Sequence, residues 1–414
     1  MAERADAKFD AIEDALAALR AGKVILVVDD EDRENEGDFV VAAEHITPEI
    51  VNLFATEGRG LICAPMSKER AMTLGLDAMV PTGDALHGTA FTVSVDAAQG
   101  VTTGISASDR AHTLRLLAKA SSRPEDLVRP GHVFPLLAQR GGVLVRKGHT
   151  EATVDLMQLA GLSPVGVLVE ILNEDGSMAR RPDLARLRER YGMPMISVAQ
   201  VVQHRLTRES TVEEVVRVQL PSALGHFDLV AFETRWTGEV HMALIKGDLA
   251  GLQAAGTPVL TRIHSQCVTG DIFGSSRCDC GEQLARAMEA VESAGAGVIL
   301  YLRQEGRGIG LVNKLRAYKL QEEGLDTVEA NEALGFKPDE RNYAVAAHML
   351  KALGITTVEL ISNNPRKREG LEDYGVSVRT TRSIHIPANP SNLRYLETKR
   401  DRMGHILDNL LHGH

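Results

Sequence analysis

The sequence predicts two mixed-sheet domains in tandem, of the α+β or α/β class. Its 414 residues exceed the length of one ordinary domain. Apolar runs of strand length alternate with helical patterns in both halves, an order typical of mixed sheets covered by helices. A hydrophobic content of 44% supplies apolar material for two cores. We expect one domain over residues 1–207 and another over residues 208–414.

The first half opens with a helix, a buried strand and an acidic loop. Apolar residues recur at helical spacing over residues 9–19, and residues 24–28 form an uninterrupted apolar run. Seven of the ten residues in Asp29–Asp38 are carboxylates. Most acidic runs are solvated loops, but this one leaves the end of a buried strand, where α/β sheets bind ligands. Dense carboxylates suit Mg²⁺, and Arg33 among them can neutralise a phosphate.

Three later stretches combine cations, glycine and histidine. Residues 102–110 open a helix, where hydroxyl side chains are ordinary caps but free amides also bind anions. The segment Arg129–Pro135 places His132 in a glycine-flanked loop. Residues 141–145 predict a strand that ends in Arg146–Thr150, a segment suited to a phosphate beside a metal ligand. A lone histidine is usually only a satisfied polar residue, but two in such loops near an acidic loop favour function.

A carboxylate also lies inside an apolar run near the end of the first half. Residues 165–173 predict another buried strand, and Glu170 lies within it. Because an unpaired buried charge is very costly, we expect Glu170 to be paired or functional.

These stretches resemble 3,4-dihydroxy-2-butanone 4-phosphate synthase over about residues 5–205. The resemblance is carried by DDEDRENEGD, residues 102–110, RPGHVFP and GHTEA, in this order. The family converts ribulose 5-phosphate to the four-carbon phosphate and formate with Mg²⁺, or Mn²⁺, which stabilises enediolate charge. The resemblance implies metal ligands at Glu34 and His149 and essential chemistry at His132 and Glu170. The implied sugar phosphate contacts are Arg33, Glu34, Asp38, Arg146, Lys147, Gly148, His149, Thr150 and Glu170.

One cysteine of the first half is ambiguous. Cys63 resembles a pocket-lining position of that family. A small buried residue of the core is an equally good interpretation.

The second half begins after a short polar linker at residues 208–211. Its sequence predicts four successive strands, then a helix over residues 283–293 and a further strand over residues 297–302. The four strands are predicted over residues 215–220, 227–234, 239–246 and 259–263.

Three of the four cysteines lie within fourteen residues, at Cys267, Cys278 and Cys280. A turn at Asp279 would let the last two converge on one ion. Thiolates suit zinc, and three ligands leave a tetrahedral position open for a water molecule, as in catalytic sites. Two alternatives stay open: buried free cysteines, or a structural site closed by His264.

Three polar segments follow predicted strands or precede helices farther along. Residues 303–310 (RQEGRGIG) differ from the dinucleotide-binding spacing, and their arginines and amides at the start of a helix over residues 311–323 favour a nucleoside triphosphate. Asp339 is placed to cap a helix, and Arg341 is either functional or on its exposed face. Residues 358–367 predict a final βα unit with asparagines and a lysine for base, ribose or phosphate.

These segments resemble GTP cyclohydrolase II over roughly residues 208–405. The resemblance is carried by Arg262–Gln283, Arg303–Lys314, Asp339–Tyr343 and Ser362–Lys367. It implies Zn²⁺ on the three cysteines, Asp339 as proton acceptor, Arg341 as nucleophile on the α-phosphate, and Tyr318 near the base. The implied GTP contacts are Arg262, Ile263, His264, Ser265, Gln266, Gln283, Glu305, Gly306, Arg307, Thr327, Ser362 and Lys367.

The implied reaction is hydrolytic opening of the guanine ring. Water activated by zinc attacks C8 and formate is released, while Mg²⁺ neutralises the departing pyrophosphate. The product is 2,5-diamino-6-ribosylamino-4(3H)-pyrimidinone 5′-phosphate. The chain departs from the family at Gln266, often Glu, which removes a charge beside the zinc, and at Ser362, often Thr, which keeps the hydroxyl.

Bulk composition excludes several classes of protein. A net charge of −10 and 4% aromatic residues disfavour a nucleic-acid partner. The N-terminus lacks signal-peptide character and no apolar run reaches membrane length, so we expect a cytoplasmic protein. We predict a bifunctional enzyme that supplies both early precursors of riboflavin, and both families imply a homodimer. The alternative is that only one half is active, the other being a scaffold or a GTP-binding sensor.

Overall fold

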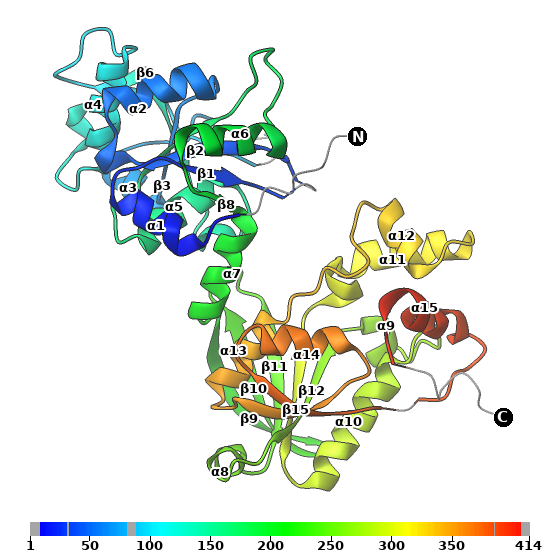
Figure 1. Cartoon of the computed structure of the whole chain (residues 1–414). Coiled ribbons are helices and arrows are strands. Elements are labelled where there is room, and N and C mark those ends of the chain that lie inside the picture. Colours follow the sequence, from blue (N-terminus) through cyan, green and yellow to red (C-terminus); the bar gives the residue numbers. More distant parts are fainter. Residues whose placement is uncertain (1–8, 31–32, 81–87, 385, 407–414) are drawn as a thin grey trace. The chain divides into compact units, whose positions relative to one another are not determined.

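The computed structural model describes residues 9–30, 33–80, 88–384 and 386–406. The chain divides into two compact units, Met1–Arg205 and Leu206–His414, each built on one mixed sheet with helices (Figure 1). The predicted class of two mixed-sheet domains in tandem is therefore confirmed. Across the described ranges, no helix has the length and apolar content needed to cross a membrane.

The first unit contains an eight-stranded sheet in the order β4-β6-β3-β7-β2-β1-β8, with β5 pairing β6. Two pairs, β3 with β6 and β1 with β8, are parallel. The strands are β1 (Ile25–Val28), β2 (Gly37–Ala42), β3 (Cys63–Met66), β4 (Ala90–Phe91), β5 (Val95–Ala97), β6 (Leu127–Leu137), β7 (Gly166–Glu170) and β8 (Met195–Ser197). The helices are α1 (Ile12–Arg20), α2 (Pro48–Leu53), α3 (Lys68–Thr73), α4 (Ala107–Ala118), α5 (His149–Leu159), α6 (Arg181–Tyr191) and α7 (Val198–Arg208), with short turns η1 (Ala43–His45), η2 (Phe54–Gly58), η3 (Pro124–Asp126) and η4 (Gly142–Leu144).

Strand β1 shows why its sequence is an uninterrupted apolar run. Leu26 and Val28 belong to one hydrophobic cluster, whereas Ile25 and Val27 belong to another. Successive side chains of a strand point to opposite faces of the sheet, so both faces of β1 are buried. The second cluster also takes residues from α1, α5 and α7, and the first takes residues from α2, α4 and α6. Helices therefore cover both faces.

Three expectations for the first unit are wrong. His132 lies in strand β6 and not in a loop, although the prolines and glycine around it are loop signals. Residues 141–145 form no strand but the short turn η4 (Gly142–Leu144) and its caps, because Gly141 and Gly142 have φ of 99° and 62° and the Val143 amide donates to Asp155. Glu170 is not enclosed in a buried strand, because it ends β7 and the residue is exposed, although its carboxylate is still partly desolvated.

The second unit contains a seven-stranded sheet in the order β15-β14-β12-β13-β11-β10-β9. Strands β15, β14, β12 and β13 are parallel, and β11, β10 and β9 continue the sheet antiparallel. The strands are β9 (Val212–Ser222), β10 (Gly225–Thr234), β11 (Val240–Lys246), β12 (Val259–Ser265), β13 (Gly297–Leu302), β14 (Thr357–Ile361) and β15 (Ser377–Arg382). The helices are α8 (Leu249–Ala254), α9 (Val268–Asp271), α10 (Cys280–Ala294), α11 (Gly310–Glu322), α12 (Thr327–Ala333), α13 (Ala344–Ala352), α14 (Pro365–Glu372) and α15 (Leu393–Met403), with the turn η5 (Glu305–Gly308).

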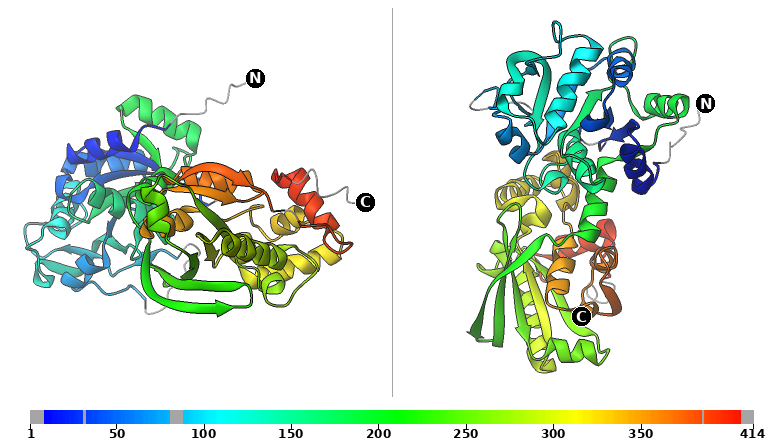
Figure 2. Two further views of the ribbon diagram at one scale, coloured as in Figure 1. Left: turned by 90° about the horizontal axis from the view of Figure 1, so that it is seen from below. Right: turned by 90° about the vertical axis from the view of Figure 1, so that its left-hand side faces the viewer.

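Helices α11, α12 and α15 gather beside one another in the second unit, yellow and red in Figure 1 and in the left view of Figure 2. An ion pair of 2.7 Å between Arg402 of α15 and Asp326, the N-cap of α12, fixes part of this arrangement. The predicted strands and the βα unit over residues 358–367 are present. The predicted helix cap at Asp339 is wrong, because Tyr343 is the N-cap of α13 and the Asp339 carboxylate binds Arg341.

Candidate active sites

The first site lies where β1 ends, β2 begins and β7 ends. Because β2 is antiparallel to both neighbours, Asp38 pairs with Val27 on one side and Glu170 on the other. Asp29 follows β1, and His149 is the first residue of α5. Sheet geometry therefore brings together residues that are more than a hundred positions apart.

Asp29, Glu34 and His149 form a group suited to a metal ion. Their ligand atoms all lie within 4.8 Å of one another. The Nδ1 atom of His149 is 3.9 Å from both Glu34 and Asp38. Buried Asp38 Oδ1 and His149 Nε2 have no hydrogen-bond partner among the described residues. Carboxylate oxygens with one imidazole are a donor set that fits Mg²⁺ or Mn²⁺.

Asp29 was not assigned by the sequence, and the structure shows what it does. Its carboxylate accepts hydrogen bonds from Arg33 at 2.8 Å and from the backbone amides of Glu34 and Glu36 at 3.2 and 2.9 Å. These bonds fold the acidic loop back over the end of β1. Asp29 thus holds the loop that presents Glu34.

The electrostatics of this site favour a bound cation. Burial and the neighbouring Glu170 and Glu34 raise the pKa of Asp38 well above its usual range. Burial and Glu34 likewise raise the pKa of Glu170, and burial lowers the pKa of His149. Carboxylates that raise one another's pKa form a site short of positive charge, which a divalent cation would relieve.

The predicted phosphate segment lies beside this group. Arg146 forms an ion pair of 2.5 Å with Glu151 and donates to Thr89 at 3.1 Å. Lys147 is exposed, Gly148 is the N-cap of α5 and Thr150 is buried in its first turn. A lysine and free helix amides next to the metal group are therefore available to an anion.

His132 belongs to a different cluster. Its Nδ1 atom is 2.7 Å from Asp96, and its backbone amide donates to the same carboxylate at 3.0 Å. A Cβ atom on Gly104 would lie 2.1 Å from Asp96, so glycine is needed there for the close approach. Both hydrogen bonds therefore direct His132 to Asp96, in strand β5. Sequence reasoning missed Asp96, whose strand carries no signal of a histidine partner.

Cys63 is buried in β3 and packs in the second hydrophobic cluster. Burial, with Glu170 and Asp38 nearby, raises the pKa of its thiol. An inert, protonated thiol next to the acidic site fits both interpretations left open by the sequence.

The second site lies at the carboxyl ends of the parallel strands β12, β13 and β14, the edge where α/β sheets bind ligands. Its cavity encloses about 1100 Å³, the open mouth included. Among the described residues, seven arginines and lysines line it against a single carboxylate, Glu305. The chain as a whole is acidic, so this local excess of cations points to a highly charged anionic ligand.

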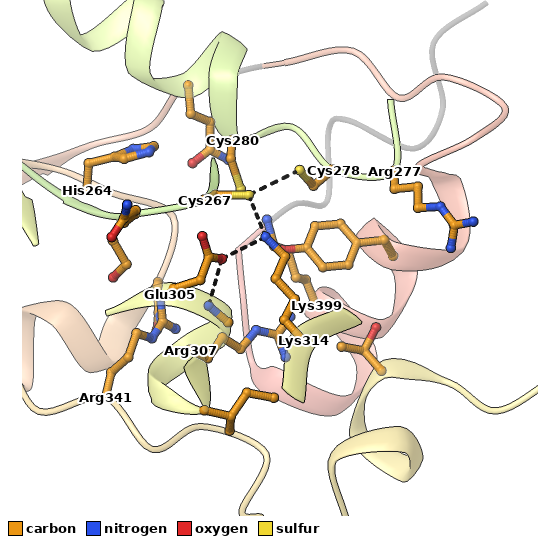
Figure 3. A pocket seen from close by; sticks show the side chains of 18 of the residues that line it. His264, Cys267, Arg277, Cys278, Cys280, Glu305, Arg307, Lys314, Arg341 and Lys399 are labelled. Atoms are coloured by element: carbon orange, nitrogen blue, oxygen red, sulfur yellow. Dashed lines mark hydrogen bonds and ion pairs between the residues drawn. The ribbon is translucent and has the colours of Figure 1, made fainter. Parts of the chain in front are cut away.

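The three cysteines converge at this cavity (Figure 3). Their sulfur atoms all lie within 4.8 Å of one another, and Cys267 and Cys278 are 3.7 Å apart. A Cβ atom on Gly270 would lie 2.8 Å from Cys278 Sγ, so glycine leaves the space that the sulfurs occupy. Hydrogen bonding with Cys278 and Cys280, and with Lys314, lowers the pKa of Cys267. A thiolate site of this kind fits zinc.

His264 does not complete the cysteine group as a fourth ligand. Its Nε2 atom is 3.0 Å from Asp271, whose other oxygen accepts from Tyr301 and from the Cys267 amide. Within the described ranges, no histidine, carboxylate or further cysteine joins the three thiols. One coordination position is thus left without a protein ligand.

Glu305, in the turn η5, and Lys314, in helix α11, lie beside the cysteines. Lys314 Nζ lies 3.0 Å from Cys267 Sγ and 2.8 Å from Glu305. Glu305 also accepts from the Val268 amide at 2.7 Å. Because three thiolates carry more charge than one Zn²⁺ ion, a buried lysine against them balances the site. Lys314 ends the segment Arg303–Lys314 that carries the family resemblance, but the sequence assigned it no role.

Arg307 is poised for an anion. It has φ of 63°, which is rare for a residue with a side chain, and neither terminal guanidinium nitrogen finds a hydrogen-bond partner in the described part of the chain. Its guanidinium lies 5.7 Å from the ring of Tyr395. A buried guanidinium left in this state favours a phosphate ligand.

Asp339 and Arg341 form a bidentate pair, with distances of 2.8 and 2.6 Å. Arg341 lines the cavity and its side chain is only 10% exposed, so its predicted alternative on an exposed helix face is wrong. Burial acts to raise the pKa of Asp339, but the hydrogen bonds from Arg341 outweigh it and lower that pKa. Asp339 is therefore an ionised acceptor next to the cavity.

Most of the predicted nucleotide contacts share the cavity. Ile263 is buried away from it and offers only its carbonyl, which accepts from Lys367 at 2.8 Å, and Asp339 acts through Arg341. Burial, with Arg262 nearby, lowers the pKa of Lys367, which an anion would reverse. The predicted residues that line the cavity are Arg262, His264, Ser265, Gln266, Gln283, Glu305, Gly306, Arg307, Tyr318, Thr327, Arg341, Ser362 and Lys367. The asparagines expected in the final βα unit, Asn363 and Asn364, line the cavity as well. Lining residues that the sequence did not assign are Arg277, Ile309, Lys314, Ala317, Gln321, Asn331, Tyr395, Lys399 and His405.

Two family models match the chain. Residues 13–204 match 3,4-dihydroxy-2-butanone 4-phosphate synthase, and residues 213–383 match GTP cyclohydrolase II.

Known proteins match over nearly the whole length. The riboflavin biosynthesis protein RibBA of Cytophaga hutchinsonii is 57% identical over 401 residues, which are 97% of this chain and 98% of that protein. The RibBA of Bacillus subtilis is 51% identical, over 96% and 99% of the two chains. RibBX, a two-domain 3,4-dihydroxy-2-butanone 4-phosphate synthase from A. baumannii, has a similar structure, with a TM-score of 0.68, 33% identity and coverage of 91% and 100%.

Proposed function

This chain belongs to the family of riboflavin biosynthesis proteins RibBA, and from that premise we propose which residues perform each of its two reactions. It is a bifunctional enzyme of riboflavin precursor synthesis, a lyase and a hydrolase. We assign the lyase reaction on ribulose 5-phosphate to residues 1–207. GTP hydrolysis is assigned to residues 208–414.

In the first unit, Glu34 and His149 would hold Mg²⁺ or Mn²⁺. Two observations support this. His149 Nε2 and Asp38 Oδ1 are buried without a hydrogen-bond partner among the described residues, and burial together with the neighbouring carboxylates raises the pKa of Asp38. When bound, the ion supplies stabilisation for negative charge that develops on the sugar oxygens. Lys147 and the first amides of α5 would bind the phosphate, and Arg33 would contribute a second cation.

Proton transfers in the sugar reaction need groups of different character. Glu170, whose pKa is raised by burial and by the neighbouring Glu34, is suited to take up and return a proton during the reaction. His132, held by Asp96, would supply a second proton-transfer group.

In the second unit, Cys267, Cys278 and Cys280 would hold Zn²⁺. The observation that carries this proposal is their convergence, with no fourth protein ligand among the described residues, on a cavity rich in cations. When bound, zinc supplies Lewis-acid activation of a water molecule for attack on the guanine ring. The product would be 2,5-diamino-6-ribosylamino-4(3H)-pyrimidinone 5′-phosphate, with formate and pyrophosphate.

The surrounding side chains would position GTP. Arg307 and Lys367 are placed to bind phosphate oxygens, and Mg²⁺ would accompany the departing pyrophosphate. Asp339 would accept a proton, and Arg341 would act on the α-phosphate. Tyr318 lines the wall beside the cysteines, where the base would lie.

Two variants with two assays test these assignments. We expect Cys278→Ser to lose bound zinc and the release of formate and pyrophosphate from GTP, while formate release from ribulose 5-phosphate persists. Glu34→Gln should lose formate release from ribulose 5-phosphate, while zinc content and GTP hydrolysis persist. Cys63→Ser is the matched control, because this fourth cysteine lies in the other unit and should leave zinc content and GTP hydrolysis unchanged.

The two alternatives, a GTP-binding sensor and an inactive scaffold unit, predict other results in the same assays. GTP binding without pyrophosphate release in the wild-type chain would identify a sensor. Activity on one substrate only would leave the other unit a scaffold. Loss of both activities in Cys278→Ser would contradict independent sites.

A homodimer and a reducing, cytoplasmic compartment are further proposals. The four free cysteines support the reducing compartment. Analytical ultracentrifugation tests the dimer.

A further inference from the structure

Helix α15 closes one side of the nucleotide cavity. Tyr395 and Lys399, both on this helix, line the cavity, although the match to the GTP cyclohydrolase II family ends at residue 383. Figure 3 shows Lys399 among the lining side chains, with Lys314 and Arg307. Nothing in the family match gives these residues a role.

Lys399 makes a buried ion pair with the turn that carries two of the cysteines. Its Nζ atom lies 2.8 Å from Asp279 Oδ1, and the two side chains are 10% and 4% exposed. The two residues are 120 positions apart in the chain. A buried lysine is held in place only if its charge is paired, so this contact fixes both partners.

Asp279 is the single residue between Cys278 and Cys280. It stands at the N-cap of α10, yet its side chain makes no capping hydrogen bond. Its second oxygen accepts from Gln283 at 2.5 Å, and Gln283 accepts in turn from Arg262 at 2.6 Å. The carboxylate therefore connects the cysteine turn to Lys399 on one side and to the nucleotide wall on the other.

The helix that carries Lys399 is itself anchored. Leu396 and Met403 are buried. Arg402 pairs with Asp326 at 2.7 Å, and the Ile406 amide donates to the carbonyl of Asn363 at 3.0 Å. The ammonium group of Lys399 also lies 4.4 Å from the ring centre of Tyr395, a cation–π contact on the same helix. Lys399 is thus presented to Asp279 from a fixed position.

We propose that Lys399 is a positioning residue for the metal group of the second site. Through Asp279 it holds the turn that brings Cys278 and Cys280 onto one ion, and α15 with Tyr395 completes the wall of the nucleotide cavity. The inference rests on the proposed function, because the three thiols must bind zinc for the turn to matter. Partners of metal ligands typically change metal affinity by ~10- to 100-fold when they are removed.

The test measures zinc affinity of the full-length chain by competition with a chromogenic chelator. Lys399→Met and Asp279→Asn should each weaken zinc binding by about 10-fold or more. The double variant should be no weaker than the weaker single variant, because Lys399 acts through Asp279. Asp401→Asn is the matched control on α15, since it removes an exposed ion pair with the neighbouring Arg400 and leaves the anchors of the helix, Lys399 and Asp279 in place.

Kinetics supply a second readout. When zinc is saturating, Lys399→Met should regain most of kcat for GTP, while KM stays raised because the wall at Tyr395 has loosened. A residue with a general structural role would instead lower the activity and the stability together, without coupling to Asp279.

Several outcomes would overturn the inference. They are a zinc affinity of Lys399→Met within about 3-fold of wild type, additive losses in the double variant, or an equal loss in Asp401→Asn. If Lys399→Met does not fold, an unchanged zinc affinity in Asp279→Asn overturns the inference by itself. A wild-type chain that binds no zinc would instead refute the proposed function.

Discussion

Replacing Lys314 with methionine should destabilise the second unit by about 3 kcal/mol. Lys314 is 11% exposed, and it lies 2.8 Å from Glu305, which is 8% exposed. Removal of one partner of a buried ion pair typically costs ~3–5 kcal/mol, because the other charge is left uncompensated. Glu305 keeps hydrogen bonds from the amides of Val268 and Gly306, at 2.7 and 2.9 Å, so the lower end of that range applies.

Lys319→Met is the matched control. Lys319 lies on the same helix, but it is 70% exposed and 3.8 Å from Glu322, which is 49% exposed. Exposed pairs contribute about 0–1 kcal/mol, so this variant should resemble the wild type.

The single tryptophan of the chain makes the measurement specific. Trp236 lies in the second unit, so its fluorescence during urea unfolding reports that unit alone. With a slope of about 2 kcal/mol per molar urea, a loss of about 3 kcal/mol lowers the midpoint by about 1.5 M. All samples contain a chelator, so that differences in zinc binding between variants do not contribute to the measured difference in stability. A change below about 1 kcal/mol in Lys314→Met, or equal changes in the two variants, would refute the reasoning.

Three further predictions concern one residue each. Burial and Arg303 lower the pKa of His241 to about 4, so the folded unit keeps this imidazole neutral while the unfolded chain takes up a proton below pH 6.5. Stability should therefore fall by about 2 kcal/mol between pH 8 and pH 5, and urea titrations of His241→Gln should lack that part of the loss. Gly270→Ala would place a Cβ atom 2.8 Å from Cys278 Sγ, so elemental analysis should find less zinc and GTP hydrolysis should fall with it, and full zinc occupancy would contradict this steric argument. Asp96→Asn should lower kcat of the ribulose 5-phosphate reaction about 100-fold, because His132 loses the carboxylate that sets its tautomer, and unchanged kcat would remove His132 from the proton transfers.

Local patterns in the sequence determined the strands, most helices and the identity of both reactive groups. The run at residues 24–28 is apolar because both faces of β1 are buried, and such a run can be recognised in the sequence without knowledge of its tertiary contacts. The three cysteines and the acidic loop carry their chemistry in residue type and spacing. The errors arose where local signals conflict with pairing: β6 accommodates the prolines and glycine around His132 in a strand, and two left-handed glycines turn residues 141–145 into η4.

Only the tertiary structure decided which charges meet. Lys399 reaches Asp279 across 120 positions, Lys314 reaches Cys267 across 47, and His132 reaches Asp96 across 36. An isolated lysine or aspartate looks the same in sequence whether it faces solvent or a buried partner. Its role is set by burial, which makes an unpaired charge costly and a paired one a fixed support, and burial exists only once the sheets have folded.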